Sequence, residues 1–171
     1  MKVKELTNWL DGRYPADMAE HWDNVGLLVG DDEAEVHHVL LALDLTEKTL
    51  DEAISAGADM IITHHPMIFE GQKKINNHSF TGRRILKLIR NRIQYYAMHT
   101  NYDVLGMAEL SADYLKLTDR EVLSVTAHTE QGEEGFGRVG CLPYKMTLKE
   151  CGEFVKEAVS YTHLRAHETL M

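Results

Sequence analysis

VLLALDLTEKTLDEAISAGADMIITHHP, residues 39–66, is the stretch that predicts the fold. It contains two continuous apolar runs, residues 39–45 and 60–63, which are typical of strands covered on both faces. Between them, Thr46 can cap a helix whose apolar residues recur at helical spacing, and Gly57 stands where that helix would end. Two apolar strands joined by a helix indicate a β-α-β unit with a parallel pair of strands.

The same kind of pattern continues on both sides of this unit. The spacing of apolar residues predicts an N-terminal helix over residues 3–10 and a strand over residues 26–29. Downstream, Thr81 can cap a further helix, and residues 93–98 have the composition of another strand. We therefore expect an α/β fold, with a mostly parallel sheet flanked by helices in three layers.

The C-terminal third of the chain is more polar. Residues 107–117 predict a helix with Leu110 and Leu115 facing inward. The Gly-rich stretch that follows predicts a turn and one strand around residues 137–142.

The end of the chain divides into a helix and a tail. Thr147 and Glu150 have the spacing of a capping box, which predicts the start of the last helix. After Val159 the stretch SYTHLRAHETLM breaks the amphipathic pattern of that helix and resembles translated adapter sequence. We expect one domain over residues 1–159 and a non-native tail over residues 160–171.

Composition narrows the classes of function. The net charge of −9 argues against a protein that wraps nucleic acid, because such proteins need a basic face. No stretch approaches the ~18 apolar residues of a membrane helix, and the start lacks a signal peptide's apolar core, so cytoplasm is the expected location. Cys141 and Cys151 form no C-x-x-C pair and are expected to be reduced and structural.

Polar side chains follow the C-terminal ends of three predicted strands. They are Asp44, His64, His65, His99, Asn101 and Asp103. Because the ends of parallel strands lie on one edge of a sheet, about 4.8 Å apart, we expect these side chains to converge. Neutral imidazoles and carboxylates favour a divalent metal such as zinc, manganese, iron or cobalt.

The adjacency of His64 and His65 bears on the number of metal ions. Successive side chains of extended backbone point to opposite sides, and Pro66 favours extended backbone at His65. The pair fits two ions more readily than one, which indicates a dinuclear centre. A solvated turn is the alternative for the histidine pair, and an ordinary Asn/Asp turn is the alternative for Asp103.

Other polar residues are weaker candidates as ligands. The dipeptide at residues 37–38 is also His-His, but it stands at the start of a strand, on the wrong edge of the sheet. His99, Asp44 and Asn101 are candidates for orienting the ligands or contacting substrate, and His99 fits a capped core histidine equally well. Residues 22–24, Trp-Asp-Asn, are more typical of a packed loop than of a site.

Five segments, in order and spacing, resemble the GTP cyclohydrolase 1 type 2 homologue family, whose members are also described as dinuclear metal-centre hexameric proteins. The segments are WDNVGLLVGD (22–31), LLALDLT (40–46), ADMIITHHPMIF (58–69), HTNYDV (99–104) and GFGRVGCLP (135–143).

The resemblance implies an α/β protein whose two halves enclose two divalent metal ions. It implies His64 and His65 as ligands, one to each ion, and Asp103 as a further ligand. The family completes its site with a His and a Glu in H-x-x-x-E spacing from a second half. We expect this chain to be truncated, lacking that second half of the family fold.

The resemblance also implies a function. It points to a metal-dependent hydrolase that acts on a nucleotide-like substrate, as in ring opening of GTP, and to self-association as a hexamer. The alternative is a non-enzymatic oligomeric protein that binds metal or docks partners. A purely structural metal is a third interpretation, which an open coordination position would contradict.

Overall fold

The structure is a computed structural model that describes residues 1–130 and 132–159. The chain forms two compact units: the first is Met1–Leu105 and the second begins at Gly106. Compact units can be lobes of one domain, so the single domain expected over residues 1–159 stays a prediction. The tail predicted over residues 160–171 lies outside the described residues.

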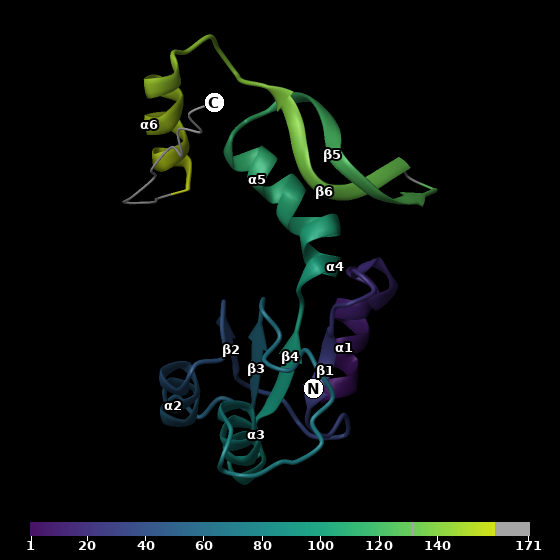
Figure 1. The fold of residues 1–171 in the computed structure, drawn as a ribbon, viewed down its shortest axis with the longest axis vertical. Helices are drawn as coiled ribbons and strands as arrows, with labels where there is room; N and C mark the ends of the chain where they lie inside the picture. Colours follow the sequence, from purple (N-terminus) through teal and green to yellow (C-terminus); the bar gives the residue numbers. More distant parts are fainter. Residues whose placement is uncertain (131, 160–171) are drawn as a thin grey trace. The chain divides into compact units, whose positions relative to one another are not determined.

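The first unit is built on a four-stranded sheet. Its strands are β1 (Gly26–Val29), β2 (Val39–Ala42), β3 (Met60–Thr63) and β4 (Gln94–Ala97), in the order β1-β4-β3-β2 (Figure 1). Strands β2, β3 and β4 run parallel, and β1 pairs with β4 in the antiparallel direction. The predicted α/β fold with a mostly parallel sheet is confirmed, and so is the parallel pairing within residues 39–66.

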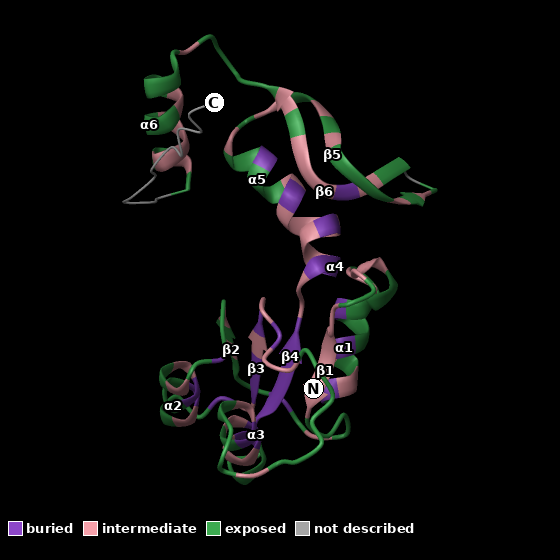
Figure 2. Cartoon of the chain, in the orientation of Figure 1, coloured by how far each residue is buried: buried purple, intermediate pink, exposed green. Residues whose placement is uncertain are grey.

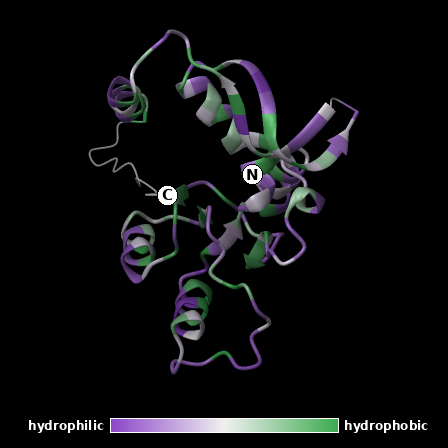
Figure 3. Cartoon of the chain, turned by 45° about the horizontal axis from the view of Figure 1, so that its top comes forward, coloured by the Kyte–Doolittle hydropathy of each residue, from purple (hydrophilic) through white to green (hydrophobic). Residues whose placement is uncertain are grey.

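Helices cover the two faces of this sheet. The helices are α1 (Val3–Asp11), α2 (Glu47–Ser55) and α3 (Phe80–Arg90). Successive residues of β3 and β4 point to opposite faces and enter two separate buried clusters. One cluster contains Ile61, Tyr95, Leu50 of α2 and Leu88 of α3; the other contains Met60, Tyr96, Val3 and Leu10 of α1. Figure 2 shows β3 and β4 as the most buried strands, and Figure 3 shows the mixed polarity expected of helices that pack on one side.

Hydrogen bonds at the helix starts test the predicted caps. Thr46 caps α2, as expected, because its hydroxyl accepts a hydrogen bond from the Thr49 N–H at 3.0 Å. The cap predicted at Thr81 is wrong. Ser79 caps α3 by accepting from the Gly82 N–H at 3.0 Å, and Thr81 already lies in the first helical turn. In the described part of the chain, no helix is both long and apolar enough to cross a membrane.

Strand β2 differs from the expectation that both its faces are covered. It is the edge strand of the sheet, and its residues alternate between exposed and half-buried. Leu41 remains 75% exposed and Leu43 59% exposed. The buried cluster that contains residues of α2 and α3 covers the other face of β2. Helix α1, by contrast, packs against β1. A continuous apolar run predicted the strand correctly, but it did not reveal what covers the strand.

The second unit contains a long antiparallel hairpin and two helices. They are α5 (Ala108–Tyr114), β5 (Thr118–Thr129), β6 (Gly132–Cys141) and α6 (Leu148–Ala158). Glu109 of α5 ties the helix to both strands, because it accepts from Arg120 Nη1 at 2.9 Å and from Arg138 Nε at 2.5 Å. The hydrogen bond from Arg138 is the main cause that lowers the pKa of Glu109.

Four predictions for this unit have mixed outcomes. The capping box at Thr147 and Glu150 is confirmed. The single strand expected around residues 137–142 is part of β6, whereas β5 was missed because its exposure varies without a continuous apolar run. Leu110 is exposed, and Ala108 and Ala112, four residues apart on one helix face, are buried instead. Both cysteines are free thiols, as predicted.

A buried hydroxyl fastens the turn that follows β3. The Tyr95 side chain is fully buried, and its hydroxyl accepts a hydrogen bond from the Met67 N–H at 2.8 Å. It also lies 2.8 Å from Thr63 Oγ1 and 3.2 Å from the carbonyl oxygen of His65. That carbonyl accepts a second hydrogen bond from Thr63 Oγ1 at 2.8 Å. Side chains of β3 and β4 thus hold residues 64–67 in one conformation.

Replacing Tyr95 by Phe should lower the free energy of unfolding by about 1–3 kcal/mol, because the Met67 amide loses its acceptor in a partly buried position. Urea denaturation measures the loss. Tyr144→Phe, at an exposed tyrosine, is the control and should change stability by less than about 0.5 kcal/mol. Equal effects of the two substitutions would contradict this role of the Tyr95 hydroxyl.

Candidate metal centre

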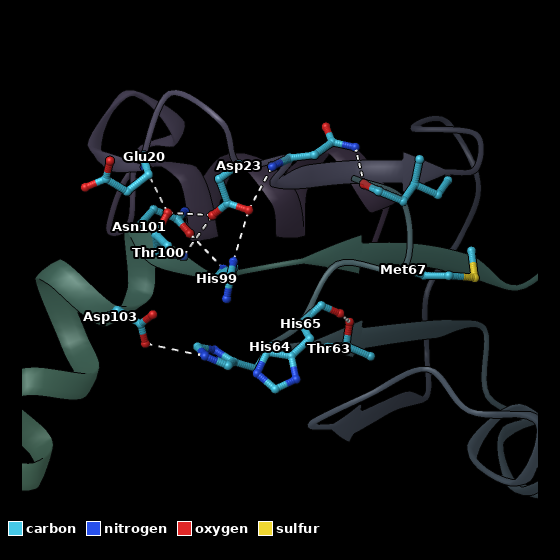
Figure 4. Close-up of polar contacts among 12 residues, drawn as sticks. Glu20, Asp23, Thr63, His64, His65, Met67, His99, Thr100, Asn101 and Asp103 are labelled. Atoms are coloured by element: carbon cyan, nitrogen blue, oxygen red, sulfur yellow. Dashed lines mark hydrogen bonds and ion pairs between the residues drawn. The ribbon is translucent and has the colours of Figure 1, made fainter. Parts of the chain in front are cut away.

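The polar residues singled out in the sequence meet at one edge of the sheet in the first unit. His64 and His65 follow β3, His99 and Asp103 follow β4, and Asp44 follows β2. Because these three strands are parallel, their C-terminal ends lie together (Figure 4). The predicted convergence of these side chains is therefore seen in the structure.

Three imidazole rings form the centre of this group. His64, His65 and His99 each offer a ring nitrogen, and these nitrogens lie within 4.8 Å of one another. The ring centroids are 5.0 Å apart for His64 and His65, 5.1 Å for His64 and His99, and 5.6 Å for His65 and His99. Of the roles left open for His99, the geometry favours one inside the polar cluster over a capped core histidine.

His64 is largely enclosed, and one of its ring nitrogens has no partner among the described residues. Its Nε2 lies 3.4 Å from Asp103 Oδ1, while its buried Nδ1 has no hydrogen-bond partner among the described residues. Burial is the largest influence and lowers the pKa of His64; the Asp103 carboxylate opposes it, and the nearby His99 and His65 reinforce it. The ring therefore favours the neutral form, in which a nitrogen lone pair is free to bind a metal ion.

His65 is oriented from the opposite side. Its Nδ1 lies 2.8 Å from Asp44 Oδ1. A carboxylate can only accept a hydrogen bond, so Nδ1 carries the proton and the Nε2 lone pair is left free. Since β3 lies between β4 and β2, His64 is paired towards β4 and His65 towards β2. The two rings thus have different carboxylate partners, but their centroids lie only 5.0 Å apart, so the expectation that adjacent side chains point to opposite sides is not met.

His99 is held by a carboxylate that lies far away in the sequence. Its Nδ1 is 3.0 Å from Asp23 Oδ1, and the Asp23 side chain is completely buried. The N–H and hydroxyl of Thr100 also donate to Asp23 Oδ2, at 3.0 Å and 2.5 Å. Burial of Asp23 is outweighed by the hydrogen bonds from Thr100 and His99, which hold its pKa below the ordinary value. Asp23 thus fixes the His99 ring with Nε2 free.

Asp23 was not singled out from the sequence, where residues 22–24 resembled a packed loop. Asp23 and Asn24 are hydrogen-bonded into the fold, but Trp22 is half exposed, so the loop is only partly packed, and it supplies the partner of His99. The only local signal is an acidic residue next to an aromatic residue, Trp22. Such pairs are too common to identify a site. The contact joins positions 76 residues apart, so local patterns do not contain it.

Asn101 and Asp103 have different positions after β4. Asn101 is buried; its side chain donates to the Tyr14 carbonyl at 2.7 Å and accepts from the His99 N–H at 3.0 Å. It therefore stabilises the turn that carries His99 rather than pointing into the cluster. Asp103 begins a π-helical turn (Asp103–Met107), a feature that is often found at functional sites.

The second histidine pair provides an internal comparison. The backbone N–H groups of His37 and His38 donate to Asp59 Oδ2, at 2.8 Å and 2.9 Å, and both residues are exposed. They precede β2 and so lie at the opposite edge of the sheet. Within the described residues, neither belongs to a cluster of potential metal ligands.

The donor set fits a divalent metal ion. It combines three imidazoles, of which two have Nδ1 committed to a carboxylate, with an unpartnered buried nitrogen on the third. Carboxylate–imidazole pairs of this kind orient metal-binding histidines in proteins. Imidazole with carboxylate suits zinc, manganese, iron or cobalt.

Comparisons with known proteins agree with the fold and with the resemblance. A model of the Duf34/NIF3 (NGG1p interacting factor 3) family matches residues 1–170. The GTP cyclohydrolase 1 type 2 homologs of Clostridium acetobutylicum and Clostridium perfringens are 40% and 35% identical to this chain. Each alignment covers 96% of this chain, but only 62% and 63% of the relatives.

Solved structures show the same relation. Staphylococcus aureus hypothetical protein SA1388 has a TM-score of 0.83 and 31% identity, over 96% of this chain and 66% of that one. Reduced HcgD from Methanocaldococcus jannaschii has a TM-score of 0.75 and 29% identity, over 92% of this chain and 60% of that one. The chain spans about six tenths of the length of these two curated relatives. By its match over nearly the whole sequence, the chain belongs to the Duf34/NIF3 family.

Proposed function

We propose that this chain supplies one half of a dinuclear divalent-metal centre in a metal-dependent hydrolase. The observation that carries the proposal is the convergence of three imidazoles, two of them oriented by carboxylates and the third with a vacant buried nitrogen. The names of the relatives, GTP cyclohydrolase 1 type 2 homologs, support a hydrolytic reaction on a nucleotide-like substrate.

In this proposal His64, His65 and Asp103 hold two divalent ions, which are zinc, manganese, iron or cobalt. Bound ions of this class supply Lewis acidity to the electrophilic atom of a substrate and stabilise charge that develops there. Asp44 keeps the His65 ring turned so that Nε2 is available. Further ligands would come from outside this chain, as the family resemblance implies, and assembly of the full-length protein as a hexamer belongs to the same proposal.

His99 has two uses in this arrangement. Because Asp23 accepts the Nδ1 proton, Nε2 can join the ligands or can accept a proton from water or from the substrate. The Asp23 carboxylate stabilises the imidazolium that results from the second use. Both uses need the same ring orientation, so Asp23 is a positioning residue in either case.

His64→Ala and His65→Ala, made in a parent chain of the relatives' full length, should each lose mainly one of two bound metal ions. The physical reason is that the two rings are paired towards different strands. Metal content after dialysis against zinc, measured by mass spectrometry, checks the result. His37→Ala and His38→Ala are the matched controls and should keep both ions. Two full ions in both site variants would disprove the dinuclear centre.

The same preparations separate the two classes of function. A hydrolase should convert GTP or another nucleotide when loaded with metal, and His65→Ala should remove that conversion. If the protein binds metal without turnover, the variants should still lose metal in the same way. The unmodified parent chain should then form no more product than His65→Ala does.

Asp23→Asn should weaken metal affinity by about 10- to 100-fold, as for other partners of metal-binding histidines. The amide oxygen can still accept from His99 Nδ1–H, but the amide NH2 then meets the Thr100 N–H that donated to Oδ2, so urea denaturation of the same variant must show that it remains folded. Competition with a zinc-binding dye measures the affinity. Asp59→Asn is the matched control, since it removes a carboxylate that binds backbone N–H groups at the other sheet edge. Unchanged affinity in Asp23→Asn would show that His99 acts without Asp23.

A further inference from the structure

Two aromatic side chains lie half exposed beside the histidine cluster. Trp22 is 52% exposed and Phe69 is 50% exposed. Their rings are stacked, with centroids 6.5 Å apart and planes inclined by 30°. Each ring also meets the His99 ring edge-on, at 5.9 Å from Trp22 and 6.1 Å from Phe69. Aromatic side chains of this size normally bury more of their surface, so a pair exposed at a polar site indicates a binding role.

Hydrogen bonds fix the positions of both rings. Asp23, next to Trp22 in the chain, is completely buried and bound to His99 and Thr100. The Asn24 side chain donates to the carbonyl oxygen of Ile68 at 2.6 Å, which joins the loop of Trp22 directly to the loop of Phe69. The aromatic pair therefore stands on two loops that are fastened to each other and to the histidine cluster.

A cavity of about 470 Å³ lies between Phe69 of this pair and His65, and Trp22 stands outside its lining. Its apolar wall is formed by Leu45, Pro66, Met67 and Phe69, and its polar groups come from Asp44, Thr46, His65 and Arg84. The volume falls in the range of small-molecule sites, and the mixture of an apolar wall with a few polar groups is typical of them. Arg84 Nε lies 3.5 Å from Glu47 Oε1, but the two buried atoms form no hydrogen bond, so Arg84 remains a polar group of this cavity beside the apolar wall.

We propose that Trp22 and Phe69 form a stacking surface that binds a planar heteroaromatic ring of the substrate beside His65 and His99. An aromatic face stacks on such a ring whatever its substituents, and the Asp44 carboxylate, whose Oδ1 holds His65, can accept from a ring N–H group through its second oxygen. This inference rests on the proposed hydrolase function and assigns these two residues the choice of substrate class. They are specificity-determining residues, with no part in the chemical step.

The test uses guanosine 5′-monophosphate as the probe and ribose 5-phosphate, which lacks the ring, as its matched comparison. Calorimetric titration of the chain should detect the first and not the second. Trp22→Ala and Phe69→Ala should each weaken binding of the nucleotide by about 10- to 100-fold. Phe69→Tyr should bind like the natural chain, and Phe69→Leu should bind like Phe69→Ala, because only the aromatic ring stacks.

The chain contains a matched control, since it has two tryptophans. Trp9 is 54% exposed on α1, where Arg13 lies 4.6 Å from its ring centroid, and Trp9→Ala should leave nucleotide affinity unchanged. In a Trp9→Phe variant, Trp22 is the remaining tryptophan, and the nucleotide should quench its fluorescence in a saturable manner. Adding Phe69→Ala to this variant should raise the dissociation constant for the nucleotide. Quenching should therefore need higher nucleotide concentrations than in the variant that keeps Phe69.

Three outcomes would overturn the inference. The first is that ribose 5-phosphate binds as tightly as the nucleotide, and the second is that Phe69→Ala leaves the nucleotide affinity unchanged. The third is that Trp22→Ala lowers thermal stability without lowering affinity, which would mean that other protein groups cover the rings. Zinc content measured on the same variants separates this result from the proposed function. Trp22→Ala and Phe69→Ala should keep the zinc content of the natural chain. If the chain binds the nucleotide but never binds metal, the metal centre is refuted while the stacking surface stands.

Discussion

The candidate centre depends on the hydrogen bonds of one buried hydroxyl, that of Tyr95. Tyr95 belongs to β4, and its partners are Thr63 at the end of β3 and the turn that carries His65 and Met67. Burial raises the pKa of Tyr95, so at neutral pH the hydroxyl is protonated and serves as both donor and acceptor. It therefore fastens two parallel strands to each other at the edge where the histidines emerge, and it limits the backbone freedom that would blur their geometry.

Above this layer, each imidazole has a carboxylate partner that comes from a different part of the first unit. The pairs are His64–Asp103, His65–Asp44 and His99–Asp23. Burial lowers the pKa of His64 and favours its neutral form, and hydrogen bonds hold the pKa of Asp23 below its ordinary value. A divalent cation is the natural complement to such a group, because it would bind ring nitrogens and carboxylate oxygens together. A chain with a net charge of −9 would also attract such cations over a longer range.

The sequence predicted what local periodicity and strand order control. The β-α-β unit of residues 39–66 follows from its apolar runs, and the meeting of His64, His65 and Asp103 follows from placing these residues at the ends of parallel strands. Contacts across long stretches of chain were not predictable in this way. Asp23 reaches His99 over 76 residues, and only the packed fold brings them together. In the β5–β6 hairpin, part of β6 was predicted and β5 was missed. A two-stranded ribbon needs no continuous apolar run to form, so the sequence gives no clear signal for it.

The loop at residues 22–24 shows how a segment that looks merely packed can organise a site. Its three side chains have three separate tasks: Trp22 exposes a stacking face, Asp23 orients His99, and Asn24 joins the loop to that of Phe69. These tasks need opposite environments, because the carboxylate must be buried to hold the imidazole while the indole must stay accessible. Trp22 lies in a turn that is closed by a hydrogen bond from the Asp23 N–H to the Glu20 carbonyl at 2.8 Å, and this turn leaves the indole half exposed while the next side chain is buried. Metal geometry and ring recognition would then be coupled through the backbone of this single loop.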